Sequence, residues 1–118
     1  MSAFLTDLIV KESEDIAVLV QPLVYESDVA GIRIEVPAGF VTDFASVPRL
    51  PIIYMLTGNT AKEAAVVHDY LYGAHITTRE VADAVFREAS IVTGVPAWRA
   101  WMMWAGVRAG GASHWDKS

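Results

Sequence analysis

Hydrophobic residues follow two different periodicities in the two halves of the chain. Up to about residue 45, short apolar runs alternate with polar residues or are bounded by turn-forming residues, most clearly at 16–20, 23–25 and 32–36. Alternation with a period of two, together with branched and aromatic residues, is typical of strands. The first half therefore predicts a small antiparallel β-sheet.

The second half predicts helices instead. A helix is predicted over residues 61–71, which are apolar at 64–67 and 71 and contain no glycine or proline, and Gly73 follows as a natural stop. Thr77 and Glu80 have the spacing of a capping box, so a second helix is expected from Thr77 to about Thr93. The connection between Gly73 and Thr77 is tight, and helices joined so closely usually pack as an antiparallel pair.

A third helix is predicted from Pro96, which suits the first helical position, to about Ala109. Together these elements predict an α+β fold: a small N-terminal antiparallel sheet followed by three helices, the first two forming an antiparallel hairpin. We expect one domain over residues 1–118, mainly β in 1–45 and mainly α in 60–109, because a chain of this length suits a single core.

The predicted hairpin brings chemically useful side chains together. Counting about 1.5 Å of rise per residue places His68 and Asp83 at similar heights above the turn, so they can meet across the helix pair. Tyr72 follows His68 by four residues and shares its face, whereas Asp69 points about a quarter-turn away. Because a general base needs a partner that orients it, His68, Asp83 and Tyr72 are candidate catalytic residues.

The helix pair resembles the active site of calcium-dependent phospholipases, especially the compact form in parvovirus capsid proteins. The matching segments are residues 64–72 and 82–86. This resemblance implies that His68 activates water, that Asp69 binds calcium, and that Asp83 orients His68 with help from Tyr72. Lipid esters are the implied substrate.

Calcium takes about six to eight oxygen ligands. In those phospholipases a glycine-rich loop upstream of the histidine supplies carbonyl oxygens to the metal. The candidate counterpart here is residues 56–59, which contain Gly58. The resemblance therefore implies a calcium site formed by Asp69 and the backbone at Gly58.

A second resemblance spans most of the chain. Residues 39–49, with the sequence GFVTDFASVPR, and the later residues His68, Asp69, Tyr72 and Asp83 are similar to a family of small uncharacterised proteins of tailed phages and prophages. The resemblance implies a phage origin, with the virion or the host cytoplasm as the location. It implies no activity.

The segment between sheet and helices holds two further candidates. Asp43 and Arg49 lie just upstream of the helix that bears His68. They can stand at the rim of the site, as an additional ligand or as an anion clamp. Alternatively, Asp43 caps a turn and Arg49 pairs with a surface carboxylate.

Composition narrows the possible partners. The chain is 53% hydrophobic and 19% charged, which predicts a covered surface, either an assembly interface or a lipid-facing patch. The net charge of −5 argues against a nucleic-acid partner, since phosphate contacts need clustered Lys and Arg. No signal-peptide pattern opens the sequence, and no apolar run is long enough for a membrane span. Zinc sites built from cysteine are excluded because the chain has no cysteine.

The third helix is rich in tryptophan. Trp98, Trp101, Met102 and Ala105 share one stripe by helical spacing, which predicts a core-facing side. Trp104 lies off that stripe. Exposed, it would anchor another phage protein or a second copy of the chain, or sit at a lipid surface. A protein partner is favoured, because two arginines attract anionic lipid only weakly.

Two hypotheses remain open at this point. In the first, the chain is a phospholipase-like hydrolase that uses His68 and a calcium ion. In the second, it is a non-enzymatic virion or tail component: His68 is a buried imidazole satisfied by Asp83, Tyr72 fills the core, and Asp83 pairs with Arg87 at i, i+4. The second hypothesis makes Asp69 dispensable.

Overall fold

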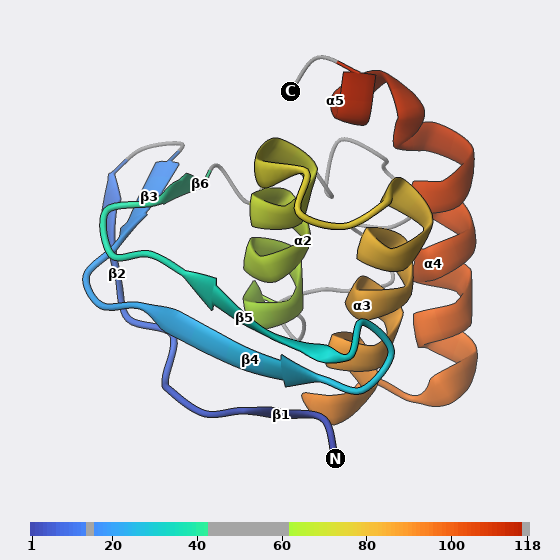
Figure 1. Ribbon diagram of the computed structural model, residues 1–118, viewed down its shortest axis with the longest axis horizontal. Coiled ribbons are helices and arrows are strands. Elements are labelled where there is room, and N and C mark those ends of the chain that lie inside the picture. Colours follow the sequence, from blue (N-terminus) through green and yellow to red (C-terminus); the bar gives the residue numbers. More distant parts are fainter. Residues whose placement is uncertain (14–15, 43–61, 117–118) are drawn as a thin grey trace.

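The structure is a computed structural model that describes residues 1–13, 16–42 and 62–116. Within these residues six strands form two three-stranded antiparallel sheets (Figure 1). One sheet has the order β1 (Ala3–Phe4), β4 (Leu23–Ser27), β5 (Ile32–Val36). The other has the order β2 (Val10–Ser13), β3 (Ile16–Leu19), β6 (Val41–Thr42). The helices are α2 (Lys62–Ala74), α3 (Arg79–Val92), α4 (Ala97–Gly110) and the short α5 (Ala112–Asp116).

The predicted α+β class is confirmed, but the strands divide into two sheets where the sequence predicted one. The chain passes from β3, in the β2-β3-β6 sheet, to β4, in the β1-β4-β5 sheet, and Pro22 lies between these two strands. Because proline has no N–H to donate to a ladder, β3 and β4 do not continue as a hairpin. Instead β3 pairs with β2 and β6, and β4 pairs with β1 and β5.

The β4–β5 hairpin supplies the sheet side of the core. Leu23, Tyr25, Ile34 and Val36 are fully buried, as the alternating pattern requires of one face. The hairpin contacts α2 and α3 (Figure 1). Glu88 of α3 fixes this contact, because it accepts hydrogen bonds from the Tyr25 hydroxyl at 2.8 Å, the Ser27 hydroxyl at 2.8 Å and the Val29 amide at 3.0 Å.

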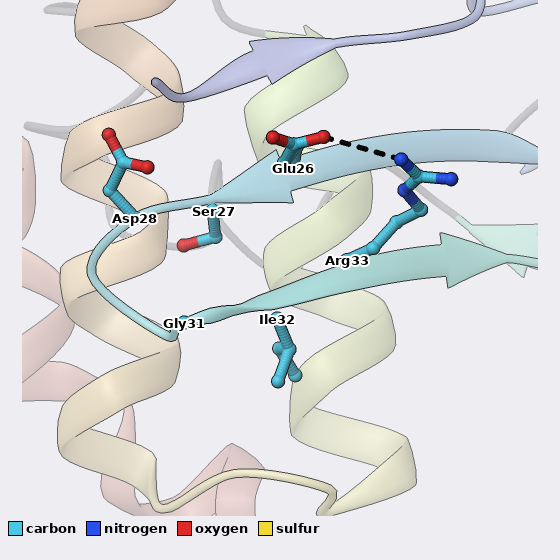
Figure 2. A pocket seen from close by; sticks show the side chains of 6 residues that line it. All are labelled: Glu26, Ser27, Asp28, Gly31, Ile32 and Arg33. Carbon is cyan, nitrogen blue, oxygen red and sulfur yellow. Dashed lines mark hydrogen bonds and ion pairs between the residues drawn. The ribbon is translucent and has the colours of Figure 1, made fainter.

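A hollow of about 450 Å³ lies at the β4–β5 turn (Figure 2). Its lining residues are Glu26, Ser27, Asp28, Gly31, Ile32 and Arg33. The polar groups in it are already engaged: Arg33 pairs with Glu26 at 3.4 Å, and Asp28 pairs with the N-terminal amino group at 3.0 Å. The hollow shares no lining residue with the predicted site.

The predicted hairpin of α2 and α3 is present, with shifted ends (Figure 1). The helix α2 continues through Gly73, and the left-handed residue after it is His75, with φ of 52°. The N-cap of α3 is Thr78, whose hydroxyl oxygen accepts from the Val81 amide at 3.2 Å. The predicted capping box was therefore wrong by one residue: the Thr77 hydroxyl donates to a backbone carbonyl instead.

The orientation of α4 also differs from the prediction. Its buried residues are Ala100, Met103 and Val107, whereas Trp98 and Trp101 are 61% and 51% exposed. Because α4 is apolar around most of its circumference, helical spacing alone cannot select the core side. The helices α3 and α4 pack together, Ala100 is buried, and Trp98 and Trp101 turn outward. No helix in the described residues is long and apolar enough to cross a membrane.

Candidate functional site

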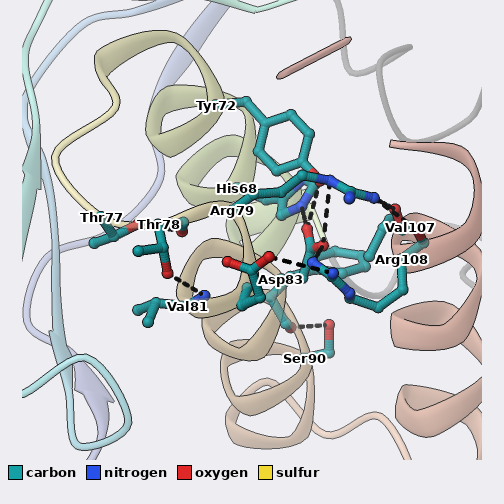
Figure 3. Close-up of polar contacts among 12 residues, drawn as sticks. His68, Tyr72, Thr77, Thr78, Arg79, Val81, Asp83, Ser90, Val107 and Arg108 are labelled. Atoms are coloured by element: carbon teal, nitrogen blue, oxygen red, sulfur yellow. Dashed lines mark hydrogen bonds and ion pairs between the residues drawn. The ribbon is translucent and has the colours of Figure 1, made fainter. Parts of the chain in front are cut away.

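His68 and Asp83 meet across the helix pair, as their spacing predicts (Figure 3). His68 Nε2 lies 2.8 Å from Asp83 Oδ1. Both residues are buried, with exposed fractions of 4% and 0%. The pair joins α2 to α3 in the interior of the fold.

Tyr72 completes the predicted trio. Its hydroxyl donates to the same Asp83 oxygen at 2.6 Å. The centroid of the Tyr72 ring lies 4.3 Å from that of the His68 ring. The centroid of the Phe86 ring lies 4.9 Å from that of the same His68 ring. One carboxylate oxygen of Asp83 therefore holds both side chains from α2, while aromatic packing restrains the imidazole.

Two arginines that sequence reasoning missed complete the cluster. Arg108 Nη1 donates to Asp83 Oδ2 at 2.8 Å, and Arg79 Nε lies 3.9 Å from the same oxygen. The expected pairing of Asp83 with Arg87 was wrong, because Asp83 points into the protein and Arg87 is exposed. Arg79 could have been found, since it precedes Asp83 by four residues on α3.

Arg79 also links the cluster to the end of α4. Its Nε donates to the Tyr72 hydroxyl at 3.3 Å, and its Nη2 donates to the carbonyls of Val107 and Arg108 at 3.1 and 2.6 Å. The last carbonyls of a helix lack partners within the helix. Arg79 therefore satisfies the C-terminal end of α4 while it borders the carboxylate.

The chain after α4 closes tightly over Tyr72. A Cβ atom at Gly111 would lie 2.5 Å from the Tyr72 hydroxyl oxygen, so only glycine permits this approach. The Trp115 ring then meets the Tyr72 ring edge-on at 5.2 Å and stacks on the His75 ring at 3.9 Å. The short helix α5 thus packs over the end of α2.

Electrostatics keep Asp83 ionised. Burial acts to raise the pKa of its carboxyl, but hydrogen bonds from His68 and Tyr72 and the Arg108 guanidinium outweigh burial and lower that pKa. Burial and the neighbouring carboxylate raise the pKa of Tyr72, so its hydroxyl remains a donor. The site therefore contains a fixed negative charge beside the imidazole.

This arrangement defines which imidazole nitrogen can act as a base. A carboxylate only accepts, so the Nε2 of a neutral His68 ring must carry the hydrogen that faces Asp83. The lone pair then resides on Nδ1. A histidine held in this way can take a proton through Nδ1 while Asp83 stabilises the resulting imidazolium.

Comparison with known proteins gives the family. A family model described as protein of unknown function (DUF1353) matches residues 17–107. The chain belongs to this family. The matched range includes His68, Tyr72 and Asp83 and ends one residue before Arg108. The expected membership of an uncharacterised family is confirmed, while the phage origin and the phospholipase resemblance stay predictions. No curated protein and no solved structure matches the chain.

Of the residues predicted to bind the metal or to line the rim of the site, the structure describes only Asp69. Asp69 follows His68 on α2 and is half-buried. Gly58, Asp43 and Arg49 lie in 43–61, outside the described residues. Among the residues that the structure describes, no group of three or more His, Asp or Glu side chains could hold a metal ion.

The lowered pKa of Asp83 predicts a specific loss of stability in acid. Its contribution is fully present above the unfolded-chain pKa of about 3.9 and is lost as the pH falls through the lower folded-state pKa. Asp83→Asn removes this titration. We therefore expect urea midpoints of the native chain to fall more steeply below about pH 4 than those of Asp83→Asn. Parallel curves for the two proteins would contradict this assignment.

Proposed function

We propose that the chain is a small hydrolase that cleaves ester bonds in lipids, with His68 as the general base. The observation that carries the proposal is that Asp83 Oδ1 accepts two hydrogen bonds, one from His68 Nε2 at 2.8 Å and one from the Tyr72 hydroxyl at 2.6 Å. This geometry orients the imidazole and leaves Nδ1 as the proton acceptor. The phospholipase resemblance of the same helix pair supports lipid as the substrate.

Each residue has a defined part in the proposed reaction. His68 Nδ1 takes a proton from water as the water oxygen forms a bond to the ester carbonyl carbon. Asp83 stabilises the positive imidazolium, and Tyr72 holds the carboxylate in place. When the carbon–oxygen bond of the ester breaks, the imidazolium returns the proton to the leaving alkoxide, so that a fatty acid and an alcohol are released.

We further propose calcium as the cofactor. Asp69 and the backbone carbonyl at Gly58 would hold the ion, because carboxylate and carbonyl oxygens are the ligands that calcium prefers. The bound ion would polarise the ester carbonyl. The position of Asp69, one residue after His68 on the same helix, supports this assignment.

Calcium is expected to stabilise the folded chain. A ligand that binds only the folded state raises the melting temperature by mass action, by about 5 °C at a tenfold excess over its dissociation constant. Asp69→Asn removes the carboxylate ligand and should abolish the shift. Thermal melts with and without millimolar calcium measure both, and magnesium serves as the control ion. No shift in the native chain would contradict the metal site.

A second candidate function follows from the arginines. Because Arg108 from α4 occupies Asp83 Oδ2 at 2.8 Å, the cluster also ties three helices together. We propose as the alternative a non-enzymatic virion or tail component in which this cluster serves packing alone. Both candidates assume a phage protein located in the virion or the host cytoplasm. Fatty-acid release from mixed liposomes separates them, since only the hydrolase should show release that depends on His68.

A further inference from the structure

An apolar stripe runs along the outward side of α4. Trp98, Trp101 and Met102 are 61%, 51% and 38% exposed. With Ala105 they follow i, i+3, i+4, i+7 spacing and share one side of the helix. We call these four residues the α4 stripe. The helix lies at the outer edge of the helical layer, beside α3 (Figure 1). The stripe has the spacing of a core face, yet it is turned to solvent.

Basic side chains accompany the α4 stripe. The helix α4 contains two arginines and no acidic residue, in a chain whose net charge is −5. The Arg99 guanidinium lies 5.9 Å from the Trp98 ring centroid. The Arg87 guanidinium lies 5.9 Å from the ring centroid of Trp104, which is outside the stripe but lies 6.4 Å from the Trp101 ring. The charged residues of α4 are therefore opposite in sign to the net charge of the whole chain.

The arginines beside the stripe remain available for a partner. Within the described part of the chain, neither Arg87 nor Arg99 forms an ion pair with a carboxylate. In contrast, Arg108 is engaged by Asp83 and Glu80. An apolar face flanked by such unpaired cations fits an anionic surface.

We propose that the α4 stripe docks on an anionic lipid bilayer. Tryptophan side chains favour the headgroup level of a membrane, and arginines beside them are attracted to anionic lipids. A second copy fits less well, because two-fold contact through this face would bring two copies of Arg99 together, and α4 itself has no acidic residue to pair them. The inference rests on the proposed function, since a lipid hydrolase must reach its substrate at a bilayer.

Vesicle binding tests the docking surface without requiring catalysis. Full-length His68→Gln protein is sedimented with vesicles of phosphatidylcholine, alone or mixed with phosphatidylserine. We expect clear binding to the mixed vesicles and at least tenfold weaker binding when Trp98→Ala and Trp101→Ala are added. Replacing Arg87 or Arg99 by glutamine should weaken binding about fivefold each.

Matched variants control for the loss of any exposed apolar residue. Val20 and Ile76 are 59% and 54% exposed and lie outside α4. Val20→Ala and Ile76→Ala should leave vesicle binding unchanged. Because the altered tryptophans are exposed, the double variant should keep the far-ultraviolet circular dichroism spectrum of the parent protein. An unchanged spectrum would show that the variant loses vesicle binding without unfolding.

Several outcomes would overturn the docking proposal. The first is that the His68→Gln protein does not bind the mixed vesicles, and the second is that the double tryptophan variant binds them equally well. The third is that the His68→Gln protein forms a dimer in sedimentation and binds no vesicles, while the double tryptophan variant is monomeric. The proposed hydrolysis fails separately. If vesicle binding depends on the tryptophans but the native chain releases no fatty acid, docking is supported and the hydrolase is refuted. If fatty-acid release is unchanged by the two tryptophan substitutions, docking alone is refuted.

Discussion

Asp83→Ala is expected to lower the free energy of unfolding by about 3–5 kcal/mol, the range for removing one partner of a buried ion pair. The carboxylate is fully buried and accepts at 2.8 Å or less from His68, Tyr72 and Arg108. Its removal leaves the buried His68 and Tyr72 donors without this acceptor, takes from Arg108 its buried partner, and also creates a cavity. Urea unfolding of the native chain and the variant measures the loss.

Asp28→Ala is the matched control for this substitution. The Asp28 side chain is 62% exposed and pairs with the N-terminal amino group at the surface. Surface ion pairs contribute little to stability, so this variant should unfold close to the native midpoint. A loss for Asp83→Ala no larger than that for Asp28→Ala would show that the buried cluster does not hold the helices together.

His68→Gln is expected to reduce ester hydrolysis about 10³-fold or more, because it removes the base and keeps a side chain that can hydrogen-bond Asp83. The glutamine amide can donate to the Asp83 carboxylate in place of His68 Nε2. It has no nitrogen lone pair with the basicity of imidazole. Rates of fatty-acid release under matched calcium and lipid concentrations measure the effect.

Tyr72→Phe distinguishes a lost base from a loosened site. It removes only the hydroxyl that donates to Asp83 Oδ1 and retains the ring beside His68. We expect a reduction of about tenfold, since the imidazole keeps both its carboxylate and its basic nitrogen. Equal losses in Tyr72→Phe and His68→Gln would mean that the cluster acts through structure and that His68 is not the base.

The contact between His68 and Asp83 could be predicted because it is nearly local. Both residues lie on helices joined by a short turn, so counting residues fixes their heights. The same reasoning places Tyr72 one helical turn after His68. The error at the cap of α3, Thr78 instead of Thr77, did not disturb this geometry, since it moved the helix start by a single residue.

The third helix could not be oriented from sequence. Its apolar residues surround most of the helix, so the side that is buried depends on tertiary packing, and the buried side contains Ala100, Met103 and Val107. Arg108 reaches Asp83 from 25 residues away, a contact that depends on that packing. The division of the strands into two sheets depends likewise on pairings between distant segments, such as β1 with β4.

Fatty-acid release from mixed phosphatidylcholine and phosphatidylserine liposomes in millimolar calcium tests the central claim most directly. Purified native chain and His68→Gln are compared after thermal melts have shown that both are folded. We predict release by the native chain, none above background by His68→Gln, and loss of native release in excess chelator. Release that persists in His68→Gln, or no release by the folded native chain, would contradict the proposed hydrolase.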